Sequence, residues 1–239
     1  MPTLLLRLFG PMQSWGTQSR FSIRDTGLEP SKSGVIGLLC AALGKSREER
    51  PNDGWPTLAV LVALRMGVRV DREGVMKADY HTAGGTHRQG DPYGVMKADG
   101  KSRGTVTSQR YYLSDADFLV GLESDEIALL RQLNDALAQP HWQLSLGRRS
   151  FVPSLPVWLP DGLREASLPD ALSAYPWQDD NRHEPPDRLR LVVEATPETA
   201  AEVRQDVPLS FAERRFTIRY VMTAYTSRPE GGKACISLA

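Results

Sequence analysis

Residues 3–16 read TLLLRLFGPMQSWG, so a leucine-rich run passes directly into a loop of glycine, glutamine, serine and tryptophan. The run predicts a β-strand, and a second apolar run, Trp142 to Leu146, predicts another strand that ends at Gly147-Arg148-Arg149. Glycine lets backbone approach a ligand closely, tryptophan stacks on bases, and arginine offers forked donors that suit phosphate. Two such loops predict a sheet whose rim holds a nucleic-acid strand. The alternative is that Trp15 is a core residue and the arginines lie in a solvated turn.

The composition is that of a globular chain. Its 239 residues can bury one large core or two small ones, and 41% are hydrophobic while 24% are charged. The apolar runs are shorter than a membrane span, and no basic leader precedes the first strand. Cys40 and Cys235 lie far apart, and no Cys/His spacing suits zinc. We therefore expect a reduced, cytoplasmic protein with no metal, no cofactor and no membrane contact.

The charge is balanced overall but unevenly distributed. The chain has 29 basic and 29 acidic residues, which argues against a uniformly positive nucleic-acid binder. Residues 1–114 contain 16 Lys/Arg and 10 Asp/Glu, a balance of +6, whereas residues 115–239 contain 13 and 19, a balance of −6. A polyanion site is therefore expected in the N-terminal part, and the acidic remainder is expected to face a protein partner.

A helix is expected soon after the first loop. Ser31 or Ser33 is a good N-cap, an apolar run follows to Leu43, and Gly44 is typical of the position just past a helix. Residues 57–64 form a second apolar run of a length that fits a buried helix or a strand equally well.

Further strands are expected over residues 66–70, 75–81 and 111–122, the first two paired as a hairpin. An amphipathic helix is expected over 127–137. Together with the first strand and helix, this order predicts an α+β fold with a ferredoxin-like or RRM-like domain over residues 1–150.

Residues 83–108 differ from the rest of this domain. They contain six glycines and few large apolar groups, which is typical of a functional insertion. Beyond it, residues 151–239 are expected to form a smaller β-rich region, in which strands 189–194 and 216–225 build a second sheet. The basic residues of the insertion that we single out are Arg88, Lys101 and Arg103.

Two short segments are candidates for chemistry. Ser31-Lys32-Ser33-Gly34 places hydroxyls, a lysine and unpaired N–H groups at a helix start, which suits phosphate, although an ordinary cap has the same pattern. Asp79-Tyr80-His81-Thr82 is expected to end a strand whose Tyr80 and His81 contact RNA without chemistry. The alternative is a metal-independent endoribonuclease in which Tyr80 and His81 are catalytic.

Five blocks occur in order along the chain: GPMQSWG at 10–16, SKSGVIGLL at 31–39, DYHT at 79–82, RYYLSDADF at 110–118 and LGRRS at 146–150. Together they are more specific than any one loop. The chain resembles the CasD-type subunits of Cascade, the type I-E CRISPR surveillance complex, in the RAMP superfamily of CRISPR-associated proteins. The resemblance covers residues 1–150 and, more weakly, 189–222.

The resemblance implies an RRM-like domain with a protruding thumb at about 83–108. It also implies a non-catalytic, RNA-binding subunit for antiviral defence that caps the 5′ handle of the CRISPR RNA. Such a subunit contacts the repeated backbone subunit and the large subunit, and meets target DNA through the assembled complex. In type I-E systems a separate endoribonuclease cuts the RNA, whereas a type I-C relative cuts it itself. The side chains expected to contact RNA are Gln13, Ser14, Trp15, Ser31, Lys32, Ser33, Tyr80, His81, Arg88, Lys101, Arg103, Arg110, Arg148 and Arg149.

Overall fold

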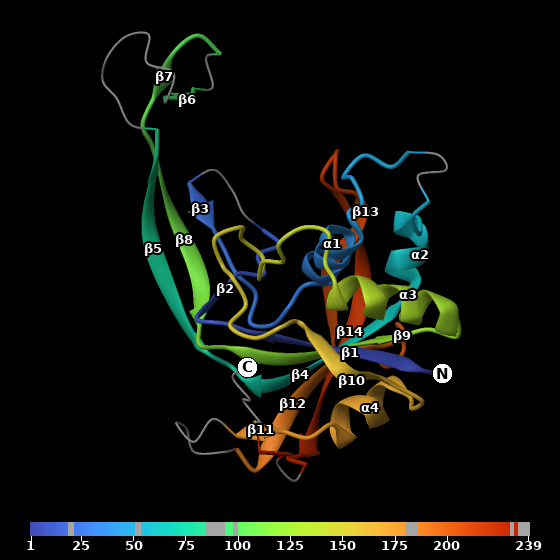
Figure 1. Ribbon diagram of the computed structural model, residues 1–239. Coiled ribbons are helices and arrows are strands. Elements are labelled where there is room, and N and C mark those ends of the chain that lie inside the picture. Colours follow the sequence, from blue (N-terminus) through green and yellow to red (C-terminus); the bar gives the residue numbers. More distant parts are fainter. Residues whose placement is uncertain are drawn as a thin grey trace.

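A seven-stranded sheet forms the centre of the molecule (Figure 1). The computed structural model describes residues 1–18, 22–50, 54–84, 94–97, 100–179, 186–229 and 232–233. The strand order is β10-β1-β9-β4-β12-β14-β13, and every neighbouring pair is antiparallel. These strands are β1 (Thr3–Phe9), β4 (Arg65–Arg72), β9 (Asp117–Glu123), β10 (Trp158–Arg164), β12 (Arg188–Glu194), β13 (Glu202–Ser210) and β14 (Arg215–Ser227).

Helices cover both faces of the sheet. Alternate residues of β1 point to opposite faces. Leu4, Leu6 and Leu8 therefore join the larger core, beneath α1 (Lys32–Leu43), α2 (Leu58–Ala63) and α3 (Ile127–Ala138). Leu5 joins the smaller core, beneath α4 (Leu168–Ala174). The predicted α+β class is confirmed, and no helix among the described residues is long and apolar enough to cross a membrane.

The start and end of α1 follow from the residues at its boundaries, as the sequence predicts. The Ser31 hydroxyl accepts a hydrogen bond from the Gly34 N–H, and Gly44 adopts φ 77°, the left-handed conformation that ends many helices. The ambiguous run 57–64 is a helix, α2, because the Thr57 hydroxyl caps it in the same way.

A long ribbon leaves the sheet (Figure 1). β5 (Val75–Ala83) pairs along its whole length with β8 (Val106–Ser114), and β8 also pairs with the short strands β2 (Met12–Gln13) and β3 (Ile23–Arg24). We call these four strands the arm. Its tip contains the hairpin of β6 (Val95–Met96) and β7 (Arg103–Gly104), whereas 85–93 and 98–99 lie outside the described residues. The last short pair is β11 (Gln178–Asp179) with β15 (Gly232–Lys233).

The predicted hairpin of 66–70 with 75–81 is wrong. β4 pairs with β9 on one edge and β12 on the other, so neither edge is left for β5. The burial of β4 explains this choice. Six consecutive residues of β4, Met66–Asp71, are buried, as expected for a central strand, whereas almost all of β5 is exposed.

Three further predictions of local structure are wrong. The run 142–146 is not a strand; Leu144 and Leu146 are buried from an irregular segment. The single strand predicted over 111–122 is two strands, β8 and β9, because the chain turns at Asp115 with φ 58°. No second sheet forms from 189–194 and 216–225; β12 pairs with β4, so both halves of the chain share one sheet.

Arg190 on β12 anchors two segments that lead to the arm. Its guanidinium donates two hydrogen bonds to Glu73 in the β4–β5 turn, with N–O distances of 2.8 and 2.6 Å. It also donates to Glu29, in the loop between β3 and α1, over 2.9 Å. Arg204, which lies on β13, contacts the same carboxylate of Glu29. The base of the arm is therefore held to the sheet by charge-assisted hydrogen bonds.

Candidate nucleic-acid interface

The loop that follows β1 contacts the loop that contains Gly147. The Ser14 N–H donates to the Leu146 carbonyl over 3.1 Å. Gly147 adopts φ 88°, and a Cβ atom there would lie 1.7 Å from the Ser14 carbonyl oxygen. No other residue fits this contact. The glycine is therefore required for the approach of the other loop.

The buried side chains of Gln13 and Trp15 hold the first loop in place. The Gln13 amide donates to the carbonyls of Leu8 and Ala116, over 2.9 and 2.8 Å, and accepts from the Trp15 indole over 3.1 Å. Trp15 is 1% exposed, and a Cβ on Gly34 would lie 2.8 Å from its ring. The polar atoms and faces of Gln13 and Trp15 are used within the protein, which does not favour the predicted contacts of these side chains with RNA. The core alternative for Trp15 is correct.

The start of α1 is already occupied by a carboxylate. The Lys32 N–H donates to Asp206 over 2.8 Å, and the Lys32 ammonium contacts the Leu64 carbonyl and Glu194, each over 2.8 Å. Burial lowers the pKa of Lys32, although Glu194 opposes the shift. The Lys32 N–H and ammonium are engaged within the protein, which does not favour the predicted phosphate site on Ser31, Lys32 and Ser33. The ordinary cap is correct, and the helix start binds a carboxylate of β13 instead.

Ser14 is also largely enclosed. Its side-chain hydroxyl donates to the carbonyls of Tyr111 and Asp25, over 3.3 and 3.4 Å, and the residue is 7% exposed. Ser14 thus ties the first loop to β8 and to the segment after β3. The predicted RNA contact of its side chain does not fit this placement.

Positive charge gathers where the second loop meets the arm. The Arg148 guanidinium donates to the carbonyls of Tyr111 and Arg24, over 2.9 and 3.3 Å, and lies 5.4 Å from the Phe151 ring centroid. Burial lowers the pKa of Arg148, and the nearby charges of Arg110 and Arg24 lower it further, against Asp79 and Asp25. The predicted Arg110 and Arg148 are thus close together.

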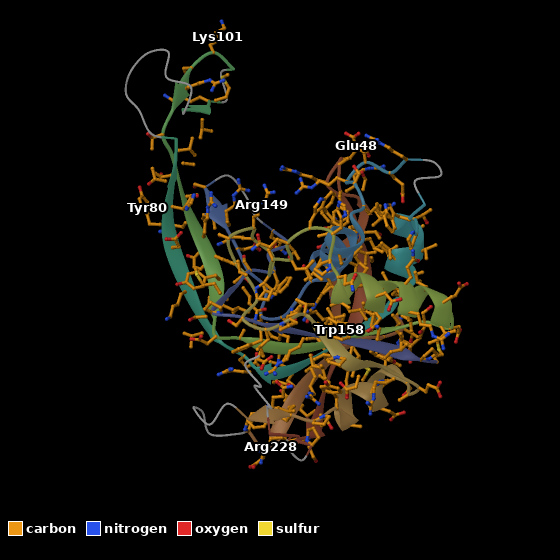
Figure 2. All side chains as sticks on the ribbon, in the orientation of Figure 1. Glu48, Tyr80, Lys101, Arg149, Trp158 and Arg228 are labelled. Carbon is orange, nitrogen blue, oxygen red and sulfur yellow. The ribbon has the colours of Figure 1, made fainter. Side chains whose placement is uncertain are left out.

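Arg149 is exposed beside Arg148, on the side of the loop that faces the arm (Figure 2). We call Arg24, Arg110, Arg148 and Arg149 the basic patch. Arg24 was not predicted, because it lies in the Gly/Pro-containing segment 10–30, where no periodicity indicates which side chains share a surface. Arg24 of β3 pairs with Arg110 of β8, and this pairing places Arg24 in the basic patch.

Tyr80 and His81 lie on opposite faces of the arm, because successive residues of a strand alternate. Asp79 is directly opposite Arg110, so Asp79 and His81 share the face of the basic patch, with 3.7 Å between the His81 Nδ1 and an Asp79 carboxylate oxygen. Tyr80 is 69% exposed on the other face, and Figure 2 shows it on the side of the arm away from Arg149. The two side chains therefore point in opposite directions, which gives the endoribonuclease alternative no support.

The remaining predicted residues belong to the tip of the arm. Lys101 is exposed there, far from Arg149 (Figure 2), and Arg103 is exposed on β7. Arg88 lies outside the described residues.

Comparison with known proteins connects this arrangement to a family. The family model described as CRISPR-associated protein (Cas_Cas5) matches residues 3–222. The CRISPR system Cascade subunit CasD of Escherichia coli (strain K12) is 36% identical over 174 residues, 70% of this chain and 73% of that protein.

Two solved structures share the fold. One, described as a crystal structure of Cas protein, has a TM-score of 0.73 and 45% identity, with 96% of this chain and 98% of that chain covered. Another, described as a CRISPR RNA-guided surveillance complex, has a TM-score of 0.73 and 37% identity, with 98% and 95% covered. Because the family model spans most of the sequence, this chain belongs to the Cas5 family of CRISPR-associated proteins.

Proposed function

We propose that this chain is a non-catalytic subunit of a Cascade-type CRISPR RNA-guided surveillance complex, in which it binds the 5′ handle of the CRISPR RNA. The observation that carries the proposal is the basic patch, where arginines from the arm and from the loop after Leu146 converge. The similarity to a Cascade subunit and to a chain of a surveillance complex supports it.

The patch has the chemistry that a phosphate backbone needs. Arg148 is stacked on Phe151 and hydrogen-bonded to two carbonyls, so its side chain is ordered before RNA binds. An ordered guanidinium loses less entropy on binding, and its planar donors match phosphate oxygens. The neighbouring arginines repel one another in the free protein, and a polyanion relieves that repulsion.

The outer face of the arm supports a protein contact. Met76 and Tyr80 point to the face opposite Arg110 and are 48% and 69% exposed. Exposed Tyr and Met are enriched where proteins bind one another. We propose that this face, with the acidic C-terminal half, contacts the backbone and large subunits, while the basic patch holds RNA.

A repeat RNA labelled at one end and mixed with the full chain in EDTA tests binding and cleavage together. We expect a saturable complex and an intact RNA over hours. His81→Ala should weaken binding only modestly. Cleavage at a single position that His81→Ala abolishes would contradict a non-catalytic role and establish the endoribonuclease alternative, because loss of a general acid or base costs about 10²–10⁴-fold in rate.

A further inference from the structure

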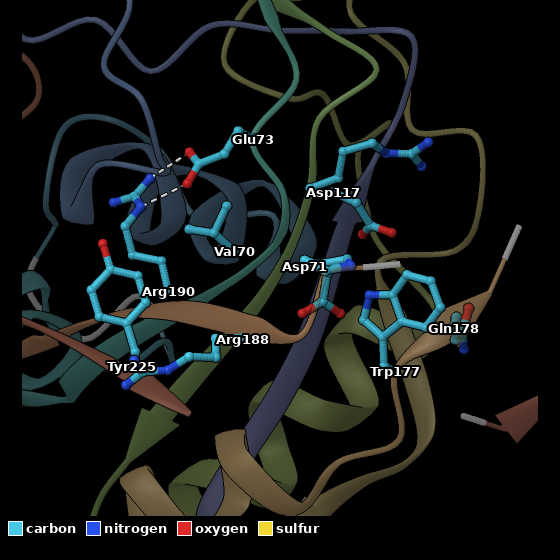
Figure 3. Close-up of a pocket in the computed structure, with 11 residues that line it drawn as sticks. Val70, Asp71, Glu73, Asp117, Trp177, Gln178, Arg188, Arg190 and Tyr225 are labelled. Atoms are coloured by element: carbon cyan, nitrogen blue, oxygen red, sulfur yellow. Dashed lines mark hydrogen bonds and ion pairs between the residues drawn. The ribbon is translucent and has the colours of Figure 1, made fainter. Parts of the chain in front are cut away.

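A cavity of about 310 Å³ lies at the foot of the arm, on residues that the basic patch does not use. Its walls come from the end of β4, the start of β12, the end of β14 and the segment after α4. Figure 3 shows the rings of Trp177 and Tyr225 on opposite sides of the cavity, with Asp71 between them. This volume is at the lower end for small-ligand sites, which leaves room for one planar group.

The carboxylates of the cavity are already neutralised. Asp71 accepts two hydrogen bonds from Arg69, over 2.6 and 2.9 Å, and the Asp117 carboxylate is held in the same two-point manner by Arg7. Glu73 is bound by the β12 arginine that anchors the arm. The acidic groups of the lining therefore repel an anionic ligand much less than their number suggests.

Arg188 lines the cavity, and Arg228 lies outside the lining; each is stacked on one of the two aromatic rings. The Arg188 guanidinium lies 5.4 Å from the Tyr225 ring centroid, and that of Arg228 lies 5.3 Å from the Trp177 ring centroid. Within the part of the chain that the structure describes, neither guanidinium is hydrogen-bonded to a carboxylate, in contrast to Arg7, Arg69 and Arg190. Stacking orders a guanidinium and leaves its in-plane N–H groups able to bind an anion.

We propose that this cavity binds one unpaired nucleotide of an RNA or DNA strand, as a second site distinct from the basic patch. Arg188 binds its phosphate, and the base enters between the aromatic walls, where Gln178 offers an amide to the base edge. Arg228 lies outside the lining and supports the site by holding the Trp177 ring. Flat apolar walls with adjacent ordered arginines are the combination that single-stranded nucleic acid requires. The site does not depend on the proposed binding of the 5′ handle.

Titration of the full chain with 5′-AMP, 5′-UMP and 5′-dAMP, followed by the NMR signal of the Trp177 indole N–H, tests this site. We expect a saturable shift with each nucleotide, and a dissociation constant at least tenfold higher in the Arg188→Gln/Arg228→Gln double variant. Arg131→Gln, on the exposed surface of α3, is the matched control and should bind as the original chain does.

Additional measurements distinguish the possible results. Arg148→Gln should leave the nucleotide shift unchanged, which distinguishes this site from the basic patch. Equal binding of AMP and dAMP supports either kind of strand, whereas a preference identifies RNA or DNA. Absence of a saturable shift, equal binding of inorganic phosphate, or tighter binding of oligoglutamate would overturn the proposal, the last in favour of an acidic protein segment.

Discussion

Gly147 lies against the backbone of Ser14 at the junction of the two loops. Gly147→Ala should destabilise the fold by well over the cost of about 1 kcal/mol for alanine at positive φ, because its Cβ would overlap the Ser14 carbonyl. Gly54→Ala is the matched control, since Gly54 has φ 81° and nothing within 4 Å of the added Cβ. Urea unfolding measures both variants, and equal losses would show that the loops do not pack in this way.

Asp206 joins β13 to α1 and to Arg219. It accepts from Arg219 over 2.7 and 2.8 Å and from the Lys32 N–H, and is 2% exposed. Burial raises its pKa, but these donors outweigh burial and lower the pKa below its usual value. Asp206→Asn should cost about 3 kcal/mol of unfolding free energy at neutral pH.

The pH dependence of this loss has a defined sign. Because the folded pKa is lowered, the stabilisation is present above the unfolded pKa of about 3.9 and is lost as the pH falls through the folded value. The difference between the original chain and Asp206→Asn should be constant from pH 5 to 8 and shrink below about pH 4. A difference that grows with acidification would contradict this pairing.

At the scale of elements, the two faces of the arm should separate RNA binding from assembly. Tyr80→Ala should leave the RNA affinity of the free chain unchanged and reduce its co-purification with the subunits of the proposed complex, because Tyr80 points away from the basic patch. His81→Ala should show the reverse. Gln132→Ala, exposed on α3 and on neither face of the arm, is the control. Loss of RNA affinity in Tyr80→Ala would place RNA on the outer face.

The sequence predicts those elements whose signals are local. Ser31 and Gly44 set the bounds of α1 through their own side chain and backbone, and β1 is a single apolar run. The partners of β4 depend on burial across the whole sheet, which no local pattern reveals. Trp15 shows the same limit for the site. The sequence around a tryptophan in a glycine-containing loop is the same whether its ring stacks on a base or, as here, packs against Gly34. Arg148 lies against the arm and Arg149 is exposed beside it, and their contact with RNA stays a prediction.

At the scale of the molecule, one sheet runs through both halves of the chain. A fragment of residues 1–150 lacks β10, β12, β13 and β14, so it exposes an edge of β1 and of β4 and loses the cover of α4. We expect this fragment to be insoluble or unfolded by circular dichroism, and the full chain to unfold in a single transition. A soluble, cooperatively folded fragment would instead establish an independent N-terminal domain.

The salt dependence of 5′-handle RNA binding by the full chain tests the role of the basic patch most directly. Each phosphate contact on a single strand contributes a slope of about 0.7 to log K against log salt, so Arg148→Ala/Arg149→Ala should flatten the slope by about 1.4 and weaken binding at low salt. Arg214→Ala/Arg215→Ala, a second exposed arginine pair at the β13–β14 turn, is the matched control and should retain the original slope. An unchanged slope in a correctly folded Arg148→Ala/Arg149→Ala variant would contradict RNA binding at this patch.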